Sequence, residues 1–229
     1  MDGGETRFGA LVRADSVSQL SEAGWEALTA YGVRTVLDLR GEHERDDDPP
    51  GDLPVEVLHV PFMEASEAEW EAIAEEIEAA ATAAPDVATS TRDVYLIFLE
   101  RFRANVAAAL KAVAHAAEGG VVVHCVGGKD RTGLLVAFLL HLAGVPDEEV
   151  AADYALSEER LRPRHETWFE AADSEEELER LRRIAQTPKE AMLGVFVELE
   201  RRHGSVERYL RSTGLTDDEL DRLRVRLHA

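Results

Sequence analysis

The 229-residue chain is poor in the residues that cross-link or anchor small proteins. It has one cysteine, which excludes an internal disulfide and a cysteine-based zinc cluster. Lysine is almost absent, since 22 of the 25 basic residues are arginine, and the three lysines are Lys111, Lys129 and Lys189. A chain of this length buries a core large enough to fold without cross-links, so we expect a single domain over residues 1–229.

Long hydrophobic runs are also missing. The longest strongly apolar stretch, residues 134–145, is interrupted by His141, and a helix that crosses a bilayer needs about 20 apolar residues. The first fifteen residues lack the apolar segment of a signal peptide. We therefore expect a cytoplasmic protein without stable membrane insertion, and secretion without a signal peptide stays open.

Positive charge is scarce. The chain has 46 acidic and 25 basic residues, a formal net charge of −21, which argues against a partner such as nucleic acid. An anionic substrate is not excluded, because salt screens a distant acidic field beyond about 8 Å and a local basic pocket can dominate. The 45% of hydrophobic residues is ordinary for a globular protein and excludes a disordered one.

Periodicity and breaker residues indicate few strands and many helices. Apolar segments predict strands at 33–39, 55–60 and 121–123. Helical spacing predicts helices at 18–31, 66–83, 91–118, 132–143, 147–161, 166–185, 188–203, 206–211 and 217–229. Residues 40–54, with three prolines, are predicted to form an irregular loop, and 85–90 a break. This order predicts an α/β fold: a small parallel or mixed central sheet flanked by helices, with a helix-rich C-terminal half.

The most informative segment is VVVHCVGGKDRTG, residues 121–133, which contains the lone cysteine. It lies between a predicted strand and a predicted helix. The backbone N–H groups at the start of a helix lack partners and, with the helix dipole, bind anions. Gly127 and Gly128 relax the backbone, so we expect the amides from Val126 to Lys129 to curl around an oxyanion.

The side chains of this loop complete a chemical proposal. Cys125, placed at a helix start, ionises readily to the nucleophilic thiolate. Arg131, six positions later, can bind two phosphate oxygens in a bidentate fork, which lysine cannot. The Thr132 hydroxyl can stabilise the thiolate once the phosphoryl group has left. Together they predict covalent phosphoryl transfer, in which Cys125 attacks phosphorus and water then hydrolyses the phosphocysteine.

This loop resembles the H-C-x5-R-[ST] loop of the cysteine-based protein tyrosine phosphatases. More narrowly, H-C-x-x-G-K-D-R-T-G resembles the bacterial broad-specificity tyrosine and lipid phosphatases related to mycobacterial tyrosine phosphatase B. The resemblance extends, in the family's order, to the segments at 13–20, 32–44, 151–154 and 203–224. It implies a tyrosine-phosphatase-like fold and protein tyrosine phosphatase activity.

The resemblance also implies the partners. In that family a lysine at the place of Lys129 accompanies activity on phosphoinositides and some on phosphoserine and phosphothreonine. We therefore expect a phosphorylated protein or a phosphoinositide as the substrate and inorganic phosphate as the product. The covalent mechanism needs no cofactor, and the eight histidines contain no H-x3-H pair, so no metal is predicted.

Two residues compete for the role of general acid, which protonates the leaving oxygen. In the related enzymes an acid follows a Pro-Phe segment after the second predicted strand, and here that position holds Glu64 rather than the expected aspartate. Asp130 lies in the loop itself and matches the family's K-D-R. It can act as the acid or base, or only orient Arg131, and both candidates stay open.

Other polar residues are predicted to support the site. We expect His124 to donate a hydrogen bond beneath the loop rather than to act as the base. Asp38 and Arg40, which end the first predicted strand, are predicted to form a buried ion network. Glu44 is expected to pair with Arg40 or to stay solvated. Some family members cover the pocket with helices, and residues 166–185 are the segment expected in that role.

Three other functions compete with this one. A catalytically weak, phosphate-binding module is favoured by the missing aspartate but opposed by the intact Cys125 and Arg131. A rhodanese-like sulfurtransferase also uses a loop cysteine, but its loop is typically one residue shorter. A P-loop ATPase is excluded because its motif, ending at Lys129, would need glycine at Val123 and serine or threonine at Asp130.

Overall fold

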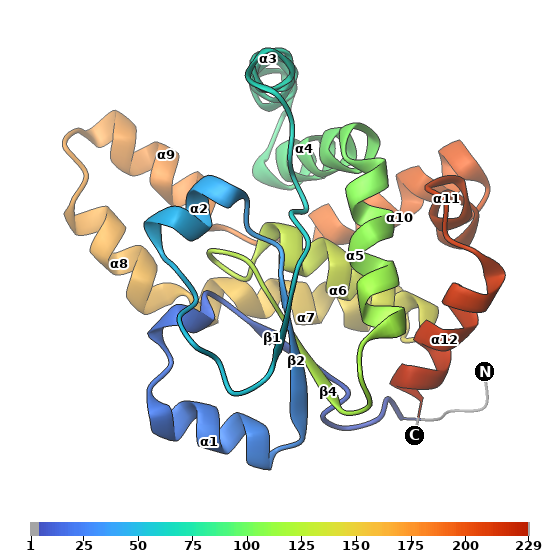
Figure 1. Ribbon diagram of the computed structural model, residues 1–229. Helices are drawn as coiled ribbons and strands as arrows, with labels where there is room; N and C mark the ends of the chain where they lie inside the picture. Colours follow the sequence, from blue (N-terminus) through green and yellow to red (C-terminus); the bar gives the residue numbers. More distant parts are fainter. Residues whose placement is uncertain (1–4, 229) are drawn as a thin grey trace.

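Four short strands form the sheet at the centre of the computed structural model, which describes residues 5–228 (Figure 1). The strands are β1 (Leu11–Ala14), β2 (Val33–Asp38), β3 (Glu56–His59) and β4 (Gly120–His124). Their order in the sheet is β1-β4-β2-β3, and every pairing is parallel. The predicted α/β class is confirmed, and the sheet is parallel rather than mixed.

Helices surround this sheet, and every element that follows β4 is a helix. A short 3₁₀ helix, η1, spans Val17–Gln19. The α-helices are α1 (Glu22–Ala30), α2 (Glu42–Asp47), α3 (Glu67–Ala83), α4 (Val87–Arg101), α5 (Arg103–His115), α6 (Asp130–Leu142), α7 (Asp147–Arg160), α8 (Arg162–Glu170), α9 (Glu175–Ala185), α10 (Lys189–His203), α11 (Val206–Ser212) and α12 (Asp217–Leu227). No helix within residues 5–228 combines the length and the apolar character that a membrane span requires.

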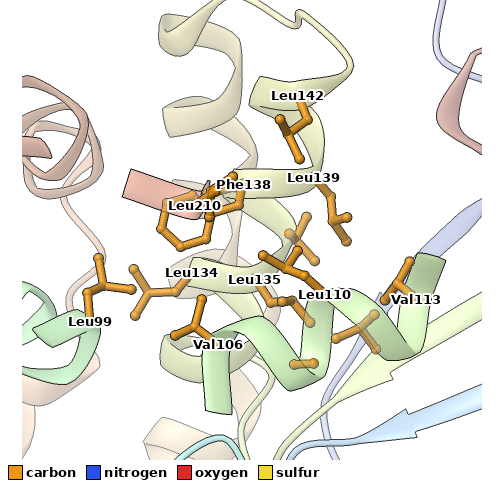
Figure 2. Close-up of a cluster of buried hydrophobic side chains, with 14 of the residues drawn as sticks. Leu99, Val106, Leu110, Val113, Leu134, Leu135, Phe138, Leu139, Leu142 and Leu210 are labelled. Carbon is orange, nitrogen blue, oxygen red and sulfur yellow. The ribbon is translucent and has the colours of Figure 1, made fainter. Parts of the chain in front are cut away.

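Both faces of the sheet are covered, and the central strands β2 and β4, which are rich in β-branched residues, are almost entirely buried. One face packs against η1 and α1 through a small cluster of buried side chains: Val17, Trp25, Val33, Val36 and Val122. The other face packs against α5 and α6 in the main core. Figure 2 shows the centre of that core, in which Leu110 of α5 and Leu134 and Leu135 of α6 lie together. The core thus fixes α6, whose first turn follows the cysteine loop.

The prediction of an irregular loop over residues 40–54 is wrong, since α2 lies within it. The helix begins at Gly41, whose backbone N–H donates to the Glu44 carboxylate at 2.7 Å. The three prolines all follow the helix and so do not break it. A charge-rich sequence without an apolar face hides this helix from periodicity.

Two predicted long helices are each divided in two. The helix expected at 91–118 begins earlier, inside the predicted break, and changes direction at Phe102 between α4 and α5. The helix expected at 166–185 is broken before Ser174, which caps α9 by accepting from the N–H of Glu177. The four-residue β1 was missed altogether, because it is short and its register depends on β4. Periodicity detects an apolar face but not the turn between two helices that share one.

Candidate active site

The carboxyl ends of three neighbouring strands meet at one edge of the sheet. In the parallel register Ala14 of β1 and Asp38 of β2 both lie opposite His124 of β4. Cys125 follows directly and is 3% exposed. In open parallel sheets ligands bind at this edge, and here the chain turns there from β4 into α6.

Glycine is required at one position of the turn. Gly128 has φ +63°, and a Cβ there would lie 2.4 Å from the carbonyl oxygen of Ala14. At Gly127 the same construction meets nothing within 4 Å. The loop therefore folds tightly against the end of β1 at Gly128 and opens toward solvent at Gly127, the two faces that an anion-binding loop needs.

The outer side of the loop is held through its carbonyl groups. The Arg13 guanidinium donates to the carbonyl oxygen of Gly128 at 3.0 Å and is itself bound by the Asp153 carboxylate at 2.9 Å. The N–H of Ser16 donates to the carbonyl oxygen of Val126 at 3.2 Å. The loop is therefore held in place from outside through its carbonyl oxygens.

Arg131 lies in the first turn of α6 and is gripped by Glu44 of α2. Its two terminal nitrogens donate to the two carboxylate oxygens at 2.5 and 2.7 Å. Burial alone would lower the pKa of Arg131, but the hydrogen bonds that it donates to Glu44 and the charge of Cys125 raise the pKa above its usual value. The guanidinium is therefore permanently charged and aimed by a bidentate pair.

The expectation that Glu44 pairs with Arg40 or stays solvated is thus wrong. Its partner is 87 residues away in the sequence. Burial would raise the pKa of Glu44, but the hydrogen bond and charge of Arg131 outweigh it and hold the pKa below the usual value. The Oε2 atom of the same carboxylate also accepts from the Gly41 N–H, so the start of α2 holds the carboxylate in place for Arg131.

Beneath the loop lies the ion network predicted for Asp38 and Arg40, both fully buried. Arg40 donates to both oxygens of Asp38, at 3.0 and 2.9 Å, and to Asp48 at 3.1 Å. Burial would raise the pKa of Asp38, but the hydrogen bonds of Arg40 outweigh it and keep the pKa low. Ser16 and Ser18 each donate to Asp48 at 2.7 Å, which closes the network. We call these five residues the loop support.

His124 and Thr132 lie on either side of the cysteine, both fully buried. The Nδ1 of His124 is 3.1 Å from the carbonyl oxygen of Cys125, the hydrogen bond expected beneath the loop. Burial lowers the pKa of His124, so the ring is neutral near pH 7 and suits this role. The Thr132 hydroxyl has no hydrogen-bond partner among the described residues. An unpaired buried hydroxyl is costly unless a ligand or thiolate uses it.

The two candidate acids occupy different places. Asp130 begins α6 beside Arg131, and its Oδ1 accepts from the Tyr95 hydroxyl at 2.6 Å and lies 3.5 Å from Lys129 Nζ. It lines the large groove in front of the loop. Glu64 is exposed before α3 and does not line that groove, although its neighbour Met63 does. The geometry therefore brings Asp130, not Glu64, to the arginine.

The groove has a volume of about 1370 Å³. Asp130 and Arg131 form its floor, Lys129 lies at its rim, and α2 supplies Glu44. Its walls come from α3, α4 and α9 and are mainly apolar, with Met63, Trp70, Ile77, Val94, Tyr95, Phe98 and Ile184 among the lining side chains. A site with a charged floor and apolar walls suits a ligand that has an anionic head and an aromatic or aliphatic body.

Two side-chain bonds connect α8 and α9 to the loop. Arg164 of α8 donates to the carbonyl oxygen of Val126 at 2.8 Å, and Lys129 donates to the carbonyl oxygen of Ile184 in α9. Residues 166–185 form two helices instead of the predicted one (Figure 1), and of these residues Arg180, Arg183 and Ile184 of α9 line the groove. Lys129 is engaged at the rim, close to Asp130.

Some contributors to the site were not found from the sequence. Arg13, Tyr95 and Arg164 contact the loop or Asp130 from positions 35 to 115 residues away in the sequence. Arg13 lies in a segment that resembles the family, so the resemblance pointed to it without giving its role. The sequence around Tyr95 and Arg164 gives no indication of their contacts, since each lies in a segment with an ordinary helical pattern.

Comparisons with known proteins agree with this geometry. A sequence profile described as the tyrosine phosphatase family matches residues 1–229. A tyrosine-protein phosphatase of Nostoc commune is 29% identical over 230 residues, which cover 95% of this chain and 74% of that protein. The triple specificity protein phosphatase PtpB of Mycobacterium tuberculosis is 28% identical over 249 residues, which cover 95% of this chain and 90% of that protein. The family profile matches the whole of this chain, which also carries the cysteine loop and the paired arginine. The chain therefore belongs to the tyrosine phosphatase family.

Proposed function

We propose that this protein hydrolyses phosphomonoesters, phosphotyrosine above all, through a phosphocysteine intermediate on Cys125. The observation that carries the proposal is the pairing of Arg131 with Glu44 across the cysteine loop. A guanidinium held in this way presents its remaining N–H groups in a fixed direction, which favours the trigonal phosphoryl group of the transition state. Cys125 follows β4 directly and Arg131 lies in the first turn of α6, so the two residues stand at the two ends of one tight loop.

The first step transfers the phosphoryl group to sulfur. The Cys125 thiolate attacks phosphorus, the S–P bond forms and the bond from phosphorus to the ester oxygen breaks. Asp130, protonated, gives its proton to the departing oxygen. The unpaired hydroxyl of Thr132 is available to donate to the thiolate when the phosphoryl group is absent.

The second step returns the cysteine. A water molecule attacks phosphorus and gives a proton to the Asp130 carboxylate, the S–P bond breaks and inorganic phosphate leaves. The loop amides and Arg131 stabilise the equatorial oxygens in both steps. No cofactor enters the sequence.

We assign the acid role to Asp130 because it lines the groove beside Arg131, whereas Glu64 is exposed outside the groove lining. The groove walls favour an aromatic leaving group, since Tyr95 and Phe98 border the floor. Breadth toward phosphoinositides and phosphoserine or phosphothreonine is part of the proposal. It is supported by Lys129 at the rim and by a relative whose name includes triple specificity.

Turnover of p-nitrophenyl phosphate tests the enzyme proposal. Wild type should release p-nitrophenolate steadily while Cys125→Ser stays at background, and radiolabelled substrate should leave acid-stable label on the wild type after a rapid quench. Turnover no faster than that of Cys125→Ser would leave a phosphate-binding module as the function.

Phenyl phosphate tests the acid, because phenolate is a poor leaving group that needs a proton. Asp130→Asn should lower kcat by about 10²-fold or more, whereas Glu64→Gln should change it less than about twofold. If Glu64→Gln lowered kcat more than Asp130→Asn did, Glu64 would be the general acid instead. A panel of phosphotyrosine, phosphoserine and phosphothreonine peptides and phosphoinositides then ranks the substrates.

A further inference from the structure

Asp130 is not free in the groove, because one of its oxygens is held from outside the loop. The Tyr95 hydroxyl of α4 donates to Oδ1 at 2.6 Å, and the Lys129 ammonium lies 3.5 Å from the same oxygen. Among the described residues Oδ2 accepts no hydrogen bond from a side chain. The carboxyl group is therefore anchored by one oxygen and open at the other.

The anchoring hydroxyl is itself anchored. The Tyr154 hydroxyl of α7 lies 2.9 Å from that of Tyr95, and the two rings meet edge to face at 82°. Tyr95 has one hydroxyl proton, which goes to Asp130, so Tyr154 must donate to Tyr95. Two hydroxyls from two different helices thus form a directed chain that ends on the carboxylate.

Both hydroxyls stay protonated while the enzyme works. Tyr95 is 2% exposed and Tyr154 is 1% exposed. Burial, followed by the negative charge of Asp130, raises the pKa of each phenol above its usual value of 10. Neither tyrosine is a candidate proton donor to substrate, and the pair serves as a fixed hydrogen-bond donor.

We propose that Tyr95, backed by Tyr154, is a positioning residue that holds the carboxyl group of Asp130 so that Oδ2 exchanges the proton with the ester oxygen. The inference rests on the proposed function, in which Asp130 is the general acid and base. The side chain of an aspartate at the start of a helix can adopt several rotamers. An acid that must come within hydrogen-bond distance of a leaving oxygen transfers its proton faster when one productive rotamer is fixed.

The competing explanation is that the two tyrosines satisfy only each other's hydroxyls in the core. In that case the Tyr95 hydroxyl matters for folding and not for proton transfer. The two explanations differ in how the loss of the hydroxyl depends on the leaving group. An acid helps a poor leaving group far more than one that departs readily as an anion.

The test compares kcat for Tyr95→Phe on phenyl phosphate and on 6,8-difluoro-4-methylumbelliferyl phosphate, whose phenolate departs without a proton. We expect kcat to fall about 10-fold on phenyl phosphate and less than twofold on the fluorinated ester, with KM unchanged on both. Tyr154→Phe should show the same selectivity at about threefold, since it removes only the outer donor. It also serves as the second variant if Tyr95→Phe folds poorly.

Tyr209→Phe is the matched control. Tyr209 is 1% exposed and its hydroxyl donates at 2.7 Å to the carbonyl oxygen of Leu99, on the same helix α4 as Tyr95. It loses an equally buried hydroxyl that does not touch Asp130, so its ratio of kcat values on the two esters should equal that of wild type. A double variant with Asp130→Asn should lose nothing further when Tyr95→Phe is added.

Equal losses on both esters, or a loss in Tyr95→Phe that adds fully to that of Asp130→Asn, would overturn the positioning role and leave the proposed function standing. A wild type that is no faster than Cys125→Ser would overturn the proposed function and this inference with it. Thermal unfolding of each variant separates a loss of folded protein from a loss of kcat.

Discussion

The two sides of the cysteine loop are built by different physical means. The loop support below it is a closed network around the buried pair of Arg40 and Asp38, completed by the partly exposed Asp48, Ser16 and Ser18. The groove face above it consists of Glu44, Tyr95, Lys129, Asp130 and Arg131, in front of apolar walls. In the loop support, every charged group is paired within the protein. At the groove face, the charged groups are also paired but still line the groove.

This difference separates the residues that stabilise the loop from those that take part in the reaction. A buried charge that loses its partner is expensive, so changes below should appear as lost stability. A charge at the groove face can be rehydrated, so changes above should appear as lost turnover with the fold intact.

The largest effect is expected from Arg40→Met. It leaves the fully buried Asp38 carboxylate without its bidentate partner and should lower the free energy of unfolding by about 3–5 kcal/mol in urea denaturation. The control is Arg45→Met, which contacts the same carboxylate at 3.4 Å from a more exposed position and should cost about 1 kcal/mol or less. Equal losses of unfolding free energy in the two variants would mean that the Arg40 network is not what mainly stabilises the loop.

Gly128→Ala should both destabilise the protein and remove most of its activity. Its backbone is left-handed, which costs an L-residue about 1–2 kcal/mol, and the new Cβ would overlap the carbonyl of Ala14 at the end of β1. Gly127→Ala is the matched control, because it points into open space one residue away. If both variants unfold at the same urea concentration, the loop does not need the tight approach to β1.

Glu44→Gln tests the groove face. The amide can still accept from the Gly41 N–H but no longer gives Arg131 a charged bidentate partner, so kcat/KM on p-nitrophenyl phosphate should fall about 10-fold. Stability should change by about 1 kcal/mol or less. Glu42→Gln, on the same helix but exposed, should match wild type in activity. A stability loss as large as that of Arg40→Met would erase the contrast between the two sides.

The smallest effect concerns pH. Because the pKa of Glu44 lies below its usual value of 4.5, the unfolded chain binds more protons than the native one as the pH falls below 4.5. The pair therefore stabilises the protein fully above pH 4.5 and is lost as the pH falls through the lowered value. The stability of Glu44→Gln should depend less on pH in that window than that of wild type, as followed by urea denaturation at a series of pH values. If the unfolding free energies of the two proteins changed in parallel with pH, the pair of Glu44 and Arg131 would not contribute to this pH dependence.

The outcome for single elements shows where sequence reasoning works. The strands at the centre of the sheet were predicted within two residues of their bounds, because a run of β-branched residues can only be buried. The break at Phe102 and the helix α2 were missed, because neither depends on the local hydrophobic pattern. A turn between two helices and a helix capped by its own Glu44 are decided by packing and by single hydrogen bonds.

The sequence by itself determined the cysteine loop. A lone cysteine, two glycines and an arginine at fixed spacing between a strand and a helix restrict the local backbone and the chemistry together, so they can be read without the rest of the chain. Only the tertiary structure decided which partners the loop has. Glu44 binds Arg131, Tyr95 holds Asp130, and Asp130 rather than Glu64 lines the groove. Those contacts join residues far apart in the chain, and their geometry exists only after the sheet has brought three strand ends to one edge.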